Sequence, residues 1–138
     1  MKLNHLHIKT TDLPATKTFY EKYFGFTKAF DHPQGEFLID EGGFLLAIFA
    51  YKNDEPQFQY PAWFHFGFCL TDEALVRTLY AQMEADNVRF AETLTEYDDG
   101  TVKFDCLDPG GHKIEVSWNP DEAPLFSDNG VLGMKSIH

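Results

Sequence analysis

Hydrophobic and polar residues alternate over two short segments of the chain, residues 3–10 and residues 62–70. Because side chains of a strand point to opposite faces in turn, this alternation predicts two half-buried β-strands. After each segment the apolar period lengthens to three or four residues, which is typical of an amphipathic helix. The stripes expected to face the core are Thr16, Phe19, Tyr20 and Tyr23 in the first helix, and Leu75, Leu79 and Met83 in the second.

Residues that favour helix ends flank both periodic segments. Asp12 and Asp72 can accept hydrogen bonds from the free amides of a first turn, and Pro14 fits the first turn of the first helix. Gly25 and Asn87 are expected to end the two helices in a left-handed conformation.

Three further strands are expected in each half, separated by turns rich in Gly, Pro and Asp. They cover residues 26–31, 35–40 and 44–51 in the first half, and 88–94, 101–107 and 112–118 in the second. The order βαβββ therefore occurs twice, which predicts an α+β fold. The polar segment 52–61 is interpreted as a linker, and residues 119–138 as a C-terminal extension.

The two halves also resemble each other residue by residue. When "HLHIKTTD" at residues 5–12 is placed on "HFGFCLTD" at residues 65–72, His5 falls on His65, and a Thr-Asp pair falls on a Thr-Asp pair. The elements keep the same order and spacing, so the chain is interpreted as a duplicated unit.

Composition narrows the function classes. The chain has 138 residues, 43% of them hydrophobic, and a net charge of −11 without a basic cluster. Nucleic acid and anionic membranes both attract basic surfaces, so neither is expected as a partner of this acidic chain. A small molecule is the expected partner. The longest apolar run, residues 44–51, is far shorter than the roughly 20 residues of a membrane-spanning helix. The two cysteines lack CxxC spacing, and a reduced, cytoplasmic protein is expected.

Two segments carry a resemblance to a known family. "LNHLHIKTTDLPATKTFYEKYFGF" and "FDCLDPGGHKIEV" resemble the opening and closing segments of the vicinal oxygen chelate superfamily. That superfamily includes glyoxalase I, extradiol dioxygenases, fosfomycin-resistance thiol transferases and bleomycin-binding proteins. The resemblance covers about residues 3–118. It implies a single glyoxalase-like domain over residues 1–138, with an open, curled mixed sheet around a metal cup.

The resemblance also implies a ligand set for one divalent ion, namely His5, His65 and Glu115. Two imidazoles and a carboxylate leave coordination positions open and suit Zn, Mn, Fe or Ni. A single His on a strand is more often a core residue, but two at equivalent positions of a repeat favour metal binding. Where glyoxalase I carries a further Glu ligand, this sequence has Ala47, which argues against a simple methylglyoxal lyase.

Two residues are candidates for proton transfer. His7 shares a strand face with His5 and is expected to contact substrate, to act as an acid or base, or to fill the pocket. Asp105 lies ten residues before Glu115, where related enzymes place Tyr. Its direction depends on the hairpin register, since a slip of one residue reverses the face. His112, after the turn, is expected to be exposed.

Four residues are candidates for substrate contact. Trp63 shares the parity of His65, and Lys103 is the positive charge of the segment "TEYDDGTVK". Phe49 and Trp118 are expected to form aromatic pocket walls, with Phe37 as a further candidate.

Two functions from different classes remain open. The first is a metal-dependent enzyme acting on a small oxygenated molecule that chelates the metal, as a lyase, thiol transferase or dioxygenase. The second is a metal-free protein that binds a drug-like molecule; a vestigial pocket is a weaker third. The curled sheets leave edges that a second copy can protect, so a homodimer is expected, with metal sites built within one chain or shared between two.

Overall fold

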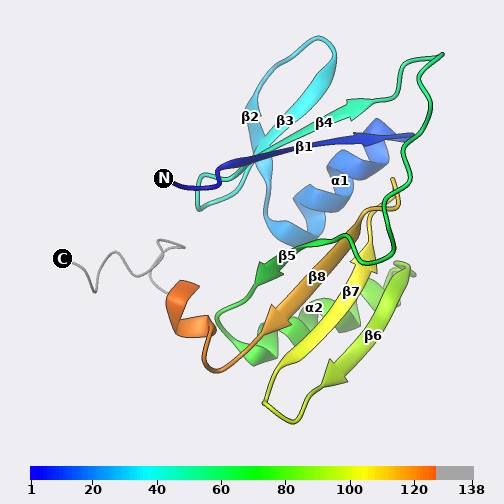
Figure 1. Cartoon of the computed structure of the whole chain (residues 1–138). Coiled ribbons are helices and arrows are strands. Elements are labelled where there is room, and N and C mark those ends of the chain that lie inside the picture. The colour runs from blue at the N-terminus through cyan, green and yellow to red at the C-terminus, as the bar shows by residue number, and fades with distance from the viewer. Residues whose placement is uncertain (127–138) are drawn as a thin grey trace. The chain divides into compact units, whose positions relative to one another are not determined.

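The computed structural model describes residues 1–126, which divide into two compact units. The N-terminal unit contains residues 1–62 together with 109–111, and the C-terminal unit contains the other described residues. Each unit has one four-stranded sheet and one α-helix (Figure 1). The expected α+β fold with two βαβββ repeats is confirmed.

The N-terminal unit follows the βαβββ order. Its elements are β1 (His5–Thr10), α1 (Leu13–Phe24), β2 (Thr27–Phe30), β3 (Gly35–Ile39) and β4 (Leu45–Ala50). The strands are arranged in the order β1-β4-β3-β2, with β1 parallel to β4 and the other pairs antiparallel. A mixed sheet results, because the chain crosses through α1 between β1 and β2.

The C-terminal unit repeats this topology. Its elements are β5 (Phe66–Cys69), α2 (Glu73–Ala85), β6 (Phe90–Glu96), β7 (Val102–Leu107) and β8 (Lys113–Trp118). The strand order β5-β8-β7-β6 matches that of the first sheet, again with one parallel pair. A short 3-10 helix, Ala123–Phe126, follows β8, and the rest of the C-terminal extension lies outside the described residues.

Both helices begin and end where the sequence predicts. Asp12 accepts a hydrogen bond from the Ala15 amide at 3.1 Å, and Asp72 accepts one from the Ala74 amide at 2.9 Å. Gly25 follows α1 with φ of 68°, and Asn87 follows α2 with φ of 59°. The local signals for capping are therefore confirmed at all four ends.

One face of each sheet packs against the helix of its own unit. In the N-terminal unit this buried face holds Ile8, Leu38, Leu46 and Ile48 against Phe19 and Tyr20 of α1. In the C-terminal unit it holds Val102, Phe104, Ile114 and Val116 against Val76 and Met83 of α2. One prediction is wrong: Leu75 is 50% exposed. Since Val76 and Met83 are seven residues apart, they set the buried stripe of α2, and Leu75 lies about 100° away from it.

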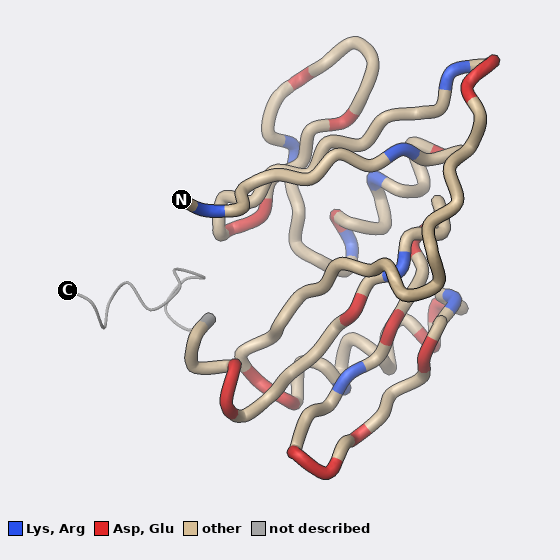
Figure 2. Tube along the Cα trace, viewed as in Figure 1, with Lys and Arg blue, Asp and Glu red and all other residues tan. Residues whose placement is uncertain are grey.

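The opposite face of each sheet is not packed against α1 or α2, the α-helices of the described residues, and we call it the open face. Register and alternation place His5, His7, Phe37, Ala47 and Phe49 on the open face of the N-terminal unit. In the C-terminal unit the open face holds Gly67, Cys69, Lys103, Asp105, Glu115 and Ser117. Figure 2 shows that acidic and basic residues both occur along β7 and β8.

Neither α1 nor α2, the two α-helices within residues 1–126, has the length and apolar content needed to cross a membrane.

Candidate functional site

The open face of the C-terminal unit brings charged residues together. Glu115 on β8 lies directly opposite Asp105 on β7 and directly opposite Gly67 on β5. Opposed residues in paired strands share a sheet face, so the Asp105 side chain lies on the same face as Glu115. The register that the sequence leaves open is therefore settled by the β7–β8 hairpin.

Lys103 is at the centre of this charged group. Its Nζ lies 3.1 Å from Glu115 Oε1, 3.2 Å from Glu92 Oε2 and 3.7 Å from Asp105 Oδ1. Burial lowers the pKa of Lys103, but hydrogen bonds to Glu115 and Glu92 and the charge of Asp105 outweigh it, so the pKa is raised above its ordinary value. Lys103 therefore stays charged and holds three carboxylates around one ammonium group.

Asp105 is the most enclosed member of the group. Only 8% of the residue is exposed, and its Oδ1 atom is buried without a hydrogen bond among the described residues. Burial raises the pKa of Asp105, and the charge of Lys103 opposes this rise. A buried carboxylate oxygen without a donor is costly, and a bound cation or substrate proton would relieve that cost.

His65 lies immediately before β5 and is oriented by the backbone. Its Nδ1 is 2.9 Å from the carbonyl oxygen of Trp63. A carbonyl oxygen only accepts, so Nδ1 carries the hydrogen and the lone pair is on Nε2. This is the arrangement that commonly orients a metal-binding imidazole.

Gly67 lets the backbone of β5 approach β8 closely beside Glu115. A Cβ atom on Gly67 would come within 2.9 Å of the Glu115 carbonyl oxygen and 3.2 Å of the Glu115 Cβ. Side chains of a strand that are two positions apart share a face, so His65 and Gly67 lie along the same side of β5. The edge of Glu115 that faces β5 is therefore not covered by a side chain from residue 67.

In the N-terminal unit, His5 has a similar local arrangement. Its Nδ1 lies 2.8 Å from Oδ1 of Asn4. This oxygen is an acceptor, so the hydrogen is again on Nδ1 and the lone pair on Nε2. Both candidate histidines thus present the same ring nitrogen, although different oxygen atoms orient them.

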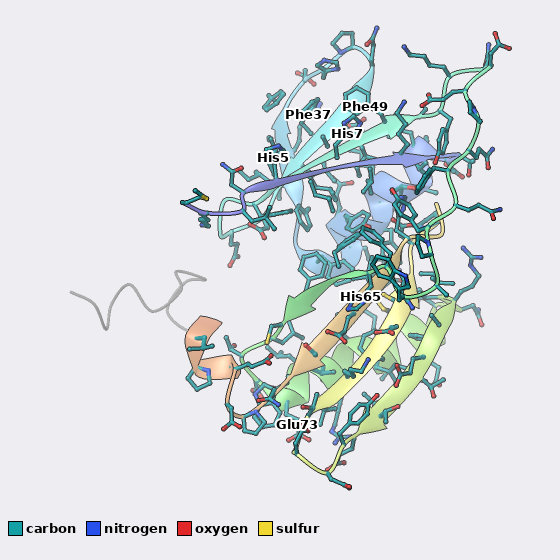
Figure 3. All side chains as sticks on the ribbon, in the orientation of Figure 1. His5, His7, Phe37, Phe49, His65 and Glu73 are labelled. Atoms are coloured by element: carbon teal, nitrogen blue, oxygen red, sulfur yellow. The ribbon has the colours of Figure 1, made fainter. Side chains whose placement is uncertain are left out.

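The open face of the N-terminal unit is aromatic. The His7 ring lies 4.7 Å from the Phe49 ring, which is 5.7 Å from Phe37 (Figure 3). His32 contacts Phe37 and Phe49, and Phe30 stacks on Phe37 at 4.5 Å. His7 is paired with Ala47, whose small side chain leaves room for these rings. The arrangement suits a planar or apolar ligand.

The model of the Glyoxalase/Bleomycin resistance protein/Dioxygenase superfamily matches residues 2–116. The chain belongs to this superfamily. No curated protein matches it.

Solved structures from the superfamily have the same fold. One described as a possible glyoxalase from Bacillus cereus is 30% identical, with a TM-score of 0.70 over 84% of this chain and 97% of that one. A lactoylglutathione lyase from Agrobacterium tumefaciens is 23% identical, with a TM-score of 0.66 over 85% and 92%. The fosfomycin resistance protein FosX from Listeria monocytogenes is 18% identical, with a TM-score of 0.73 over 91% and 98%. The last two show likeness of fold alone.

The predicted metal ligands are divided between the two units. His5 belongs to the N-terminal unit, whereas His65 and Glu115 belong to the C-terminal unit. Within residues 1–126, no three His, Cys, Asp or Glu side chains form a group that could hold a metal ion. The donor types nevertheless fit a divalent metal, and the hydrogen bond at Nδ1 of each imidazole leaves its Nε2 as the ligand atom.

The other predicted residues are distributed more widely. Trp63 is 74% exposed and its carbonyl oxygen orients His65. Trp118 is paired with Val102 and shares the parity of Val116, so it lies on the helix-covered face rather than beside Glu115. The expectation that His112 is exposed is wrong, because it is 4% exposed and its Nδ1 contacts Asp108 at 2.8 Å. The turn folds back on itself, and Asp108 also accepts from the His112 amide.

Sequence reasoning missed Glu92 and Tyr97. Phe90 lies opposite the buried Cys106, yet Glu92 lies opposite Asp105, because β6 contains an irregularity between them. Simple alternation therefore assigns Glu92 to the wrong face. Tyr97 follows β6 and donates a hydrogen bond of 2.6 Å to Glu92.

Proposed function

We propose that this chain is a metal-dependent enzyme of the superfamily, with one divalent ion bound by His5, His65 and Glu115. The observation that carries the proposal is that both histidines use Nδ1 in a local hydrogen bond, which leaves Nε2 of each ring available to a metal. The carboxylate of Glu115, which no side chain of residue 67 covers on its β5 side, supplies the third donor.

This donor set suits Zn, Mn, Fe or Ni, because two imidazoles and one carboxylate leave coordination positions open. When bound, such a metal would polarise two neighbouring oxygen atoms of a small substrate. The proposal therefore covers a lyase, a thiol transferase or a dioxygenase acting on an oxygenated molecule.

The chain's own residues supply binding and proton transfer. Phe49 contacts the His7 ring and holds it on the open face, where its imidazole can accept or return a proton. Asp105 is a second proton acceptor, because burial raises its pKa toward the working pH of a general base. Lys103 offers a permanent positive charge to an anionic substrate oxygen. Trp63 is retained as a more distant candidate for contact with the substrate, whereas Trp118 lies on the helix-covered face, away from the open face.

A second candidate is a metal-free protein that binds an aromatic, drug-like molecule. The aromatic open face of the N-terminal unit favours it, since Phe30 is 49% exposed while stacked on Phe37. Exposed aromatic surface of this kind is typical of a ligand site. This alternative does not explain the orientation of His5 and His65.

Elemental analysis of protein purified without a His tag tests the enzyme proposal. We expect one transition metal per chain, retained in His32→Ala and lost in His65→Ala and Glu115→Ala. His32 is the control because it is an exposed imidazole outside the ligand set. Wild-type protein that is purified without metal and does not bind added Zn(II), Mn(II) or Fe(II) would overturn the proposal. The metal-free binding protein would then be the better explanation.

We also propose a cytoplasmic homodimer. Its cytoplasmic location is supported by Cys69 and Cys106, which are both free thiols. Mixing His5→Ala chains with Glu115→Ala chains tests whether sites are shared. If each site takes residues from two chains, the mixed dimer regains one complete ligand set and binds metal. A monomer in sedimentation at micromolar concentration would contradict the dimer.

A further inference from the structure

We propose that Lys103 competes with the divalent metal for Glu115 and thereby sets the metal affinity of the protein. This inference rests on the proposed metal-dependent function, and concerns a residue outside the ligand set. The Lys103 ammonium already occupies one side of the carboxylate, with Nζ 3.1 Å from Glu115 Oε1. A metal ion that takes Glu115 must weaken this ion pair.

The strand order explains how one carboxylate can serve two cations. In the order β5-β8-β7, Glu115 lies on the middle strand, with Gly67 on one side and Asp105 on the other. Lys103 approaches from β7. On the β5 side, residue 67 has no side chain and His65 precedes the strand, so we place the metal on this side. The two cations therefore approach Glu115 from opposite neighbouring strands.

Charge balance indicates that a second cation is accommodated. Glu92, Asp105 and Glu115 supply three negative charges around the single positive charge of Lys103. The buried Oδ1 atom of Asp105 also lacks a hydrogen bond and lies on this open face. A divalent ion would complete the neutralisation of the group.

Lys103 keeps other partners when metal binding weakens its ion pair with Glu115. Its Nζ is 3.2 Å from Glu92 and 3.7 Å from Asp105, so the ammonium remains paired with these two carboxylates. The Lys103 side chain is only 19% exposed, and salt screens such a charge weakly. Its opposition to metal binding should therefore persist at high ionic strength.

Zn(II) titration against a chromogenic chelator tests the inference in untagged, full-length protein. Lys103→Met should bind Zn(II) on the order of tenfold more tightly than wild type, because a hydrogen-bonded charge partner of Glu115 is removed. Lys103→Arg keeps the charge and should bind no more tightly than wild type. Thermal melts of each variant establish that it is folded.

Lys113→Met is the matched control. Lys113 lies on the same face of β8, two residues from Glu115, so the variant removes an equal charge from the same surface. We expect a smaller gain in affinity for this variant, and one that disappears in high salt.

Three results separate the inference from the proposed function. If wild type binds Zn(II) and Lys103→Met binds no more tightly, the role of Lys103 is overturned while the metal site stands. If Lys113→Met gains as much as Lys103→Met, the effect is general electrostatics and the inference is again overturned. If neither wild type nor Lys103→Met binds Zn(II), both the inference and the metal-dependent function fail.

Discussion

The two open faces differ in chemistry although they lie on sheets of the same topology. The N-terminal face carries rings, with His7, Phe37 and Phe49 in mutual contact. The C-terminal face carries charges, with Lys103 among Glu92, Asp105 and Glu115. The helix-covered faces of both units remain aliphatic and aromatic. Packing against a helix requires apolar side chains on one face of each repeat, whereas the open face has no such requirement.

Under the proposed function, the two units would have separate tasks. The charged face would bind the cation and substrate oxygens, and the aromatic face would contact the apolar part of a ligand. Four sets of variants test how far the faces of the two units differ in packing, charge and stability.

The largest effect is expected when a buried side chain on a helix-covered face is truncated. Phe104 is 0% exposed, and Phe104→Ala should lower the free energy of unfolding by about 3–5 kcal/mol through the lost contacts and the cavity. Phe49→Ala, on the open face, should cost clearly less. Urea unfolding measures both variants, and equal losses would show that the open face is also part of the core.

The next effect concerns the close approach of β5 to β8. Gly67→Ala places a Cβ 2.9 Å from a backbone oxygen of β8, which should destabilise the protein by about 1–3 kcal/mol. The control is Gly42→Ala, whose Cβ meets only the Asp40 side chain at 3.4 Å. The prediction is contradicted if chemical denaturation finds both variants equally stable.

A smaller effect depends on pH and distinguishes the two cysteines of the C-terminal unit. Burial raises the pKa of the Cys106 thiol to about 12 from an unfolded value of 9.0. Above pH 9 the unfolded chain loses this proton first, so stability falls by about 1.4 kcal/mol per pH unit until the folded thiol also ionises.

Urea unfolding at pH 8, 9 and 10 measures this dependence, and Cys106→Ala should remove it. Cys69 is the comparison, because it is only partly buried on the open face. Native protein should be alkylated at Cys69 first. An unchanged pH profile in Cys106→Ala would contradict the assignment of the effect to that thiol.

The smallest effect is expected for a second charge network in the same unit. Arg77 of α2 donates to Glu73 and Glu96, as Lys103 binds several carboxylates on the open face. The Arg77 side chain is 43% exposed, so solvent and salt screen its pairs. Arg77→Met should leave the midpoint of urea unfolding unchanged within error. A clear loss of stability in Arg77→Met would show that these exposed pairs are not screened by solvent.

The sequence predicts most of the fold because its signals are local. Periodicity identifies the strands and helices, and Asp12, Asp72, Gly25 and Asn87 mark the helix ends through their own backbone and side-chain chemistry. The equivalence of His5 and His65 is likewise visible in the sequence, because both residues begin the repeated segment.

The site needed information that is not local. The face of Asp105 depends on hairpin register, and Glu92 reaches the same face only through the irregularity of β6. His112 is buried because Asp108 binds both its amide and its ring, a closure that no periodic pattern indicates. Strand pairing therefore decides which charged side chains meet.

The irregular strands β2 and β6 also influence how the protein resists aggregation. Each forms one edge of its sheet, and each breaks register with its neighbour, between Lys28 and Phe30 and around Glu92. An incoming strand finds no even row of donors and acceptors along such an edge. The opposite edges, β1 and β5, are regular. Strand addition is therefore less favourable at β2 and β6 than at a regular edge, so these two strands limit edge-to-edge aggregation.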